Sequence, residues 1–155
     1  TVQDNITRLG TVTTGTMKNT IHSDTTFPTG HVLKTQMFDS SASITQESSG
    51  SWESSDITSG SFSHASGNKI LVMAVCMLAT SVAGYYVRVG GTTSGPELER
   101  YKGTTDTQID TVTYIFLDSP SGTSTTYTVQ FKRNTSGTAT FYNASSKLIL
   151  MEVKG

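Results

Sequence analysis

The sequence predicts an all-β domain: an antiparallel β-sandwich of jelly-roll type, preceded by an extended N-terminal segment. Three observations lead to this prediction: a composition poor in helix formers, short stretches of alternating apolar and polar residues, and turn residues between these stretches. Charged residues make up 15% of the 155 residues, against about 25% in an average protein. Ser and Thr are frequent instead, and both favour strands and turns over helix interiors. The length fits one hydrophobic core.

Residues 1–29 differ from the rest of the chain because their apolar residues stand alone among Thr, Asn and Gly. Such spacing cannot build an apolar face within one chain, so the segment is either a disordered tether or a stalk that winds around partner chains. We interpret it as a stalk or attachment segment. The candidate attachment residues are Ile6, Leu9, Val12 and Met17.

Residues 30–155 form the predicted head domain, and its first half holds four expected strands. Alternation predicts a strand over 32–38, after the turn at Pro28-Thr29-Gly30, and a weaker strand over 57–64. The run 69–79 is apolar at successive positions, which is typical of a central strand covered on both faces. A fourth strand is expected over 82–89.

The second half begins with a polar segment over 90–105, which we expect to be the longest loop. Strands follow over 111–117, 127–132, 138–142 and 147–153. About eight strands joined by turns match a sandwich, and the jelly roll is the commonest arrangement expected at this length.

Two of these strands, 69–79 and 147–153, carry more apolar residues than one sandwich core uses. Burial of their second face in a three-fold interface between copies of the chain would account for the excess. The sequence therefore predicts a homotrimer. The candidate interface residues are Val72, Ala74, Leu148 and Leu150.

Charge and hydropathy argue against nucleic acid and membrane as partners. The chain has 11 Lys and Arg and 12 Asp and Glu, with a net charge of −1 and no dense block of either sign, so no nucleic-acid footprint is expected. The run 69–79 is about half as long as a bilayer-spanning helix. The single cysteine, Cys76, lies inside this run and is expected to be a buried apolar side chain.

No catalytic motif or metal-ligand spacing is present. His22, His31 and His64 lie in polar segments without a recognisable nucleophile or ligand motif around them. The carboxylates lie mostly in turn-like surroundings, where Asp commonly caps its own backbone. We expect a protein that is not an enzyme and needs no metal or cofactor.

Aromatic residues in polar segments are the remaining candidates for ligand binding, because sugar rings stack on aromatic side chains. Trp52 lies in the polar stretch 48–55, and Tyr101 lies in the expected long loop between Arg100 and Lys102. These four residues are candidate ligand-binding residues. Packing in the core or at an interface is the alternative for both aromatic rings.

Five segments of the chain look familiar together, and they are Phe27 to Leu33, Gly67 to Val72, Phe116 to Pro120, Tyr127 to Gln130 and Leu148 to Val153. They resemble, in the same order, a widespread family of marine bacteriophage virion structural and fibre proteins. The resemblance covers residues 27–155, and it implies a virion location and a trimeric β-domain. It carries over no binding or catalytic residue. Lys34 departs from the Gln that is common in the family.

The expected function is that of a trimeric fibre head on the virion surface, whose loops attach to a host surface glycan or protein. Residues 1–29 would join the head to other virion proteins. Two alternatives remain open: a capsid-decorating or tail structural subunit without receptor binding, and a bacterial carbohydrate-binding or adhesin module.

Overall fold

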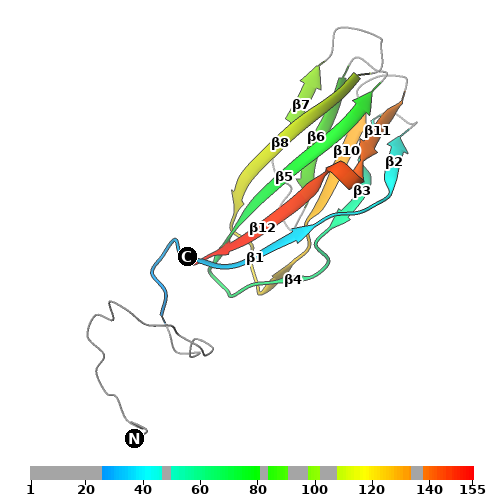
Figure 1. Ribbon diagram of the computed structural model, residues 1–155. Coiled ribbons are helices and arrows are strands. Elements are labelled where there is room, and N and C mark those ends of the chain that lie inside the picture. Colours follow the sequence, from blue (N-terminus) through cyan, green and yellow to red (C-terminus); the bar gives the residue numbers. More distant parts are fainter. Residues whose placement is uncertain (1–25, 47–49, 81–83, 91–97, 102–107, 134–137) are drawn as a thin grey trace, which may run out of the picture.

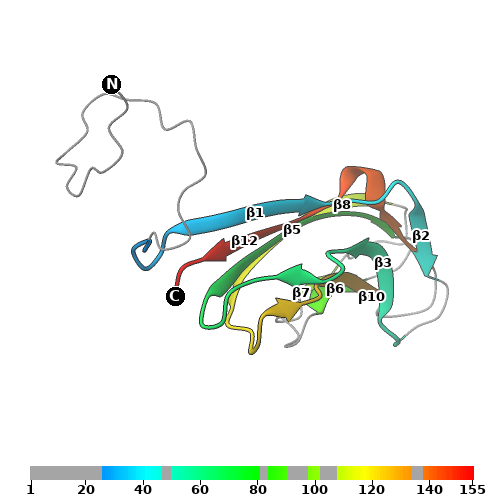
Figure 2. The same cartoon turned by 90° about the horizontal axis from the view of Figure 1, so that it is seen from below.

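The chain folds into a sandwich of two antiparallel sheets. The computed structural model describes residues 26–46, 50–80, 84–90, 98–101, 108–133 and 138–155. Figure 2 shows the two layers, with β1, β12, β5 and β8 in one and β3, β10, β6 and β7 in the other. The elements are β1 (Val32–Phe38), β2 (Ser43–Gln46), β3 (Glu53–Thr58), β4 (Phe62–Ser63), β5 (Lys69–Thr80), β6 (Gly84–Gly90), β7 (Leu98–Tyr101), β8 (Gln108–Asp118), β9 (Ser124–Thr125), β10 (Thr128–Arg133), β11 (Ala139–Tyr142), the 3₁₀ turn η1 (Asn143–Ser145) and β12 (Lys147–Val153).

The first layer, sheet A, is built around β5, as the apolar run 69–79 predicted. β8 pairs with one edge of β5 along its length, and the other edge is shared by β12 and β11. β1 continues the sheet beyond β12, and β2 continues it beyond β11. Sheet A is therefore four strands broad, with one interruption where β11 gives way to β12.

Ser146 bridges this interruption. Its hydroxyl donates to the carbonyl oxygen of Tyr142 at 2.7 Å and accepts a hydrogen bond from the backbone N–H of Met77 at 2.9 Å. Met77 lies in β5 between the residues that pair with β12 and those that pair with β11. The side chain thus satisfies a backbone donor that the break in the ladder would otherwise leave open.

The second layer, sheet B, has the strand order β3-β10-β6-β7, and β4 and β9 form a separate two-stranded ribbon. If β1 and β2 are counted as one interrupted strand, and β11 and β12 as another, the two main sheets contain eight strands. Numbered 1 to 8 along the chain, with β4 and β9 left out, these strands have the order 1-8-3-6 in sheet A and 2-7-4-5 in sheet B. This is the jelly-roll topology, so the predicted all-β antiparallel sandwich is confirmed.

The core lies between the two sheets and is filled mainly by aromatic and branched side chains. Phe131 of sheet B meets Phe141 of sheet A with ring centroids 5.4 Å apart, and both rings are fully buried. Tyr85 and Tyr127 are also buried with their rings in this layer. Aromatic pairs of this kind contribute to stability beyond the area that they bury.

The two ends of the sandwich differ in what they carry. Residues 26–31 enter at the end where β12 finishes, because Gly30 donates its N–H to the carbonyl oxygen of Lys154 and Lys154 donates to that of His31, both at 2.8 Å. Four strands finish at the opposite end, as the strand directions in Figure 1 show. Their last residues are Gln46, Thr80, Tyr101 and Arg133.

Two local predictions were wrong, and one strand was missed. The expected strand 57–64 is broken after Thr58, because Gly60 has a φ of 56° and turns the chain towards β4. The expected long loop 90–105 contains a strand, β7, which pairs with β6. Strand β2 was missed because its four residues, Ser43–Gln46, include a single apolar side chain, Ile44.

Candidate functional site

The outward side of sheet A is apolar across all four strands. The pairing register aligns Ile115, Met73, Ile149 and Met37 in one row that crosses β8, β5, β12 and β1. The neighbouring row runs from Leu117 through Leu71 and Met151 to Thr35. We call the apolar residues on this side the outer face of sheet A. They are Ile109, Ile115 and Leu117 of β8, Leu71, Met73, Val75 and Met77 of β5, Ile149, Met151 and Val153 of β12, and Val32 and Met37 of β1.

Solvent exposure concentrates on the two edge strands of this sheet. Of the described residues, the six large apolar side chains that are exposed are between 36% and 61% exposed, and all of them belong to β1 or β8. The side chains of β3, β6 and β10 in sheet B contribute none to this group. A single exposed apolar side chain is common on protein surfaces. A contiguous patch of such side chains instead marks an interaction surface.

The predicted interface residues are on the opposite side of these strands. Val72, Ala74, Leu148 and Leu150 are fully buried and pack in the core between the two sheets. They cannot contact a second copy of the chain, so their assignment to an interface was wrong. The apolar excess that motivated it belongs to the alternate residues of β5 and β12, such as Met73 and Ile149.

The edge of β8 lacks the usual features that prevent edge-to-edge pairing. Its 11 residues contain no Lys, Arg or Pro, and its pairing with β5 shows no bulge. The carboxylate of Asp110 accepts hydrogen bonds from the Tyr85 hydroxyl and the Thr111 N–H. The opposite edge strand, β1, has a bulge between Val32 and Lys34. Among the described residues no strand pairs with the outer edge of β8, and such an apolar edge is a site for association.

The outward side of sheet B is cationic and aromatic. Trp52 is half-buried there, with the Cζ of Arg88 at 4.1 Å and the Nζ of Lys132 at 4.4 Å from its ring centroid. Lys132 also lies 4.6 Å from the ring centroid of Tyr86, and Arg88 donates from Nε to the Gln130 amide oxygen at 2.8 Å. Trp52 is therefore neither a core side chain nor an open aromatic platform, since two cations already stack on its ring.

The other predicted ligand residues are not grouped with Trp52 by any described contact. Arg100 and Tyr101 lie in strand β7, opposite Tyr85 and Gly84, and not in a loop. Lys102 lies outside the described residues. The predicted attachment residues Ile6, Leu9, Val12 and Met17 also lie outside them.

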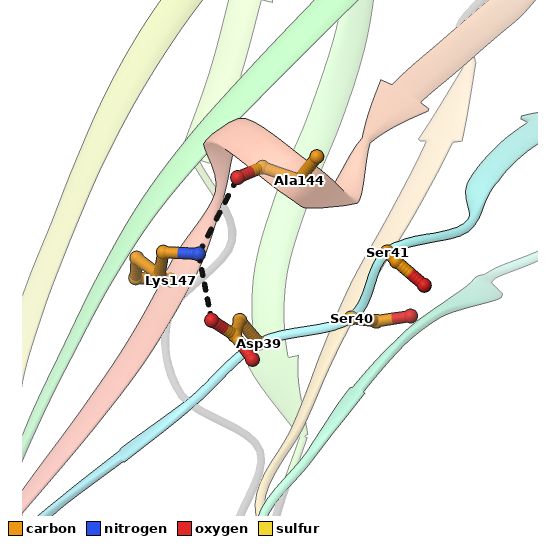
Figure 3. A pocket seen from close by; sticks show the side chains of 5 residues that line it. All are labelled: Asp39, Ser40, Ser41, Ala144 and Lys147. Carbon is orange, nitrogen blue, oxygen red and sulfur yellow. Dashed lines mark hydrogen bonds and ion pairs between the residues drawn. The ribbon is translucent and has the colours of Figure 1, made fainter.

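A small hollow opens at the interruption in sheet A, and Figure 3 shows its lining. It is lined by Asp39, Ser40, Ser41, Ala144 and Lys147, and has a volume of about 240 Å³, below the roughly 300–1,000 Å³ of typical ligand pockets. Lys147 Nζ lies 2.8 Å from the Asp39 carboxylate and 3.3 Å from the Ala144 carbonyl oxygen. Through these contacts Lys147, the first residue of β12, is joined to the segment after β1 and to η1, so its charge has structural partners.

Three buried ionisable side chains have structural partners. Glu152 Oε1 accepts from the Ala65 N–H at 2.8 Å and from the Asn68 amide at 2.7 Å, which ties the turn before β5 to β12. His64 contacts the Thr125 hydroxyl through Nε2 at 3.2 Å. Asp118 accepts from the Tyr127 hydroxyl at 2.7 Å. These contacts hold turns and strand ends in place.

Cys76 lies fully buried in the core, and burial raises the pKa of its thiol to about 12. Within the described part of the chain, no three His, Cys, Asp or Glu side chains are grouped to hold a metal ion. The same part contains no helix long and apolar enough to cross a bilayer.

No protein-family model matches the chain, and no curated protein matches it.

Proposed function

We propose that this chain is a non-enzymatic structural protein of a virion surface, the head of a trimeric fibre that attaches to a host. The observation that carries the proposal is the place where the chain enters the sandwich. Gly30 and His31 pair with Lys154 at one end of it. The other end, where β2, β5, β7 and β10 finish, is directed away from this connection.

Such an arrangement suits a module mounted at the tip of a support. The long strands β5 and β8 run along the sandwich from one end towards the other in Figure 1. The resemblance to marine phage fibre proteins points to the same role. The apolar outer face of sheet A supports the expectation that several copies of the head assemble side by side.

The bacterial carbohydrate-binding alternative requires a ring that a sugar can stack on. Trp52 offers less of its ring to a sugar than an open platform does, because Arg88 and Lys132 lie within 4.1 Å and 4.4 Å of its centroid. The capsid-decorating alternative does not require the Trp52 ring to be accessible.

Immunogold electron microscopy of the virus and cell fractions of sea water, with antibodies against the chain, separates the three functions. We expect gold at the tips of phage fibres. Gold spread over capsids would support the decorating role and overturn the fibre-head proposal. Gold on bacterial envelopes without phage would support an adhesin module. Blocking of phage adsorption by the purified chain then tests host attachment directly.

A further inference from the structure

We infer that the outer face of sheet A is the contact surface between copies of this chain, with the same face of the neighbouring copies as its occupant. The inference deepens the proposed function, on which it rests, by naming the assembling surface. The row Ile115, Met73, Ile149 and Met37 forms its centre.

The breadth of the face identifies the kind of partner that can cover it. Strands lie about 4.8 Å apart, so the first and fourth strands of the sheet are separated by about 14 Å. A single extended segment is about 5 Å broad, so one pass along the sheet covers about a third of this breadth. The apolar residues of segment 1–29 stand alone among polar ones, so they offer no continuous apolar surface to match the face. Each further copy of the chain supplies a sheet of the same breadth and the same apolar character.

The size of the face fits a reversible contact. Each residue on one side of a sheet occupies about 33 Å², so the twelve apolar residues give a footprint on the order of 400 Å². This matches the largest apolar patches of monomers and lies below the roughly 800 Å² per partner of a standard interface. Association through this face is thus expected to depend on protein concentration.

The chemistry of the face fits an apolar, adaptable partner. Lys69 and Lys147 are the charged residues among the outward positions of β5, β8 and β12, and Lys147 already pairs with Asp39. Two copies would therefore meet with little repulsion. Four of the five Met residues of the chain, Met37, Met73, Met77 and Met151, lie on this face. Methionine side chains adapt to irregular surfaces, which suits a contact between two curved sheets.

Sedimentation velocity of the full chain over a wide range of concentrations tests the inference. The variants are Ile115→Glu and Met37→Glu, at positions that are 57% and 61% exposed in one chain. Each should keep its fold, measured by circular dichroism and thermal unfolding, because neither side chain is in the core. The control is Thr126→Glu, which places the same charge at an exposed position between β9 and β10.

We expect the wild-type chain and Thr126→Glu to sediment as assemblies at high concentration, and both face variants to sediment as single chains. Met37 and Met73 should also be protected from peroxide oxidation in the assembly, as read by mass spectrometry, and lose this protection on dilution. A wild-type chain that stays monomeric at every concentration overturns the inference. So do face variants that assemble like the wild type.

The two proposals fail separately. An assembly of two copies through this face supports the inference and contradicts a trimeric fibre. An assembly through this face that leaves phage adsorption unblocked supports the inference and argues against host attachment. A monomer that blocks adsorption supports the attachment function and overturns the inference.

Discussion

Tyr127 and Cys76 show how single residues of the core carry polar atoms without weakening it. The Tyr127 ring is fully buried, and its hydroxyl donates to the carboxylate of Asp118 at the end of β8. Burial, followed by the hydrogen bond to Asp118, raises the pKa of Tyr127 far above its ordinary range. Cys76 instead acts as a small apolar side chain, as its sequence context predicted.

Tyr127→Phe should lower the free energy of unfolding by about 1–3 kcal/mol, because the buried Asp118 carboxylate loses this donor. Urea unfolding measures the change. Tyr142→Phe is the matched control, since this ring is only half-buried, and a change within about 0.5 kcal/mol is expected there. An equal loss of unfolding free energy in both variants would show that the hydrogen bond to Asp118 does not contribute to stability as expected.

The thiol of Cys76 should resist alkylation in the folded chain and react once the chain is unfolded in urea. Burial in the folded chain raises the pKa of this thiol from 9.0 to about 12. Between pH 9 and pH 12 the thiol therefore loses its proton in the unfolded chain and keeps it in the folded chain. The free energy of unfolding should therefore fall with rising pH from about 9 to 12, and this contribution should be constant below 9.

Cys76→Ala isolates that contribution. The substitution should cost about 1 kcal/mol near neutral pH, comparable to the loss of a buried methyl group. Above pH 9 the difference between wild type and variant should shrink, because only the wild type loses stability through the thiol. A difference that stays constant up to pH 12 would contradict a buried, neutral thiol.

The elements of sheet A show how a long strand keeps its pairing across a break. β5 spans 12 residues, and neither β11 nor β12 is long enough to accompany it alone. η1 shifts the chain between the two, and the Ser146 hydroxyl takes over the pairing role at Met77. The ion pair of Lys147 with Asp39 lies at the same break, but exposed pairs of this type stabilise by about 1 kcal/mol at most.

Ser146→Ala should therefore destabilise the chain by about 1–3 kcal/mol, since the Met77 N–H and the Tyr142 carbonyl oxygen both lose a partner. Ser145→Ala is the control, because Ser145 is exposed in the same turn. Hydrogen exchange should show faster exchange at Met77 in the Ser146 variant. An unchanged exchange rate at Met77 would contradict the bridging role.

The whole molecule has two unlike outer surfaces and two unlike ends. Sheet A presents an apolar face, whereas sheet B presents Trp52 with the cations of Arg88 and Lys132. In an assembly that buries the outer face of sheet A, the charged surface of sheet B stays outward. Gly30 and His31 pair with Lys154, at the end remote from the end of β10.

A chain that begins at Thr26 should retain the thermal unfolding midpoint of the full chain to within about 2 °C, because β1 and the pairs of Gly30 and His31 with Lys154 stay intact. A shift of this size corresponds to a loss of about 0.5 kcal/mol in a domain of this length. Calorimetry at one concentration measures the midpoint. A larger fall would show that residues 1–25 stabilise the head and would contradict the predicted division at residue 29.

The sequence determined the elements whose pattern is strong. Residues 32–38, 69–79 and 147–153 were predicted as strands, and they form β1, β5 and β12 almost to the residue. The all-β class and the central place of β5 followed from composition and from its apolar run. Short pieces such as β2 and β7 were missed because pairing with a neighbour, and not their own residues, makes them strands.

Tertiary structure alone decided which side of each apolar strand is the core. Alternation with a period of two identifies an inner face when the other face is polar. In β5 both faces are apolar, so Val72 and Met73 cannot be told apart by pattern. The packing of sheet B against one side buries Val72 and leaves Met73 outward. For the same reason the sequence predicted an apolar excess, and only the fold placed it on the outer face of sheet A.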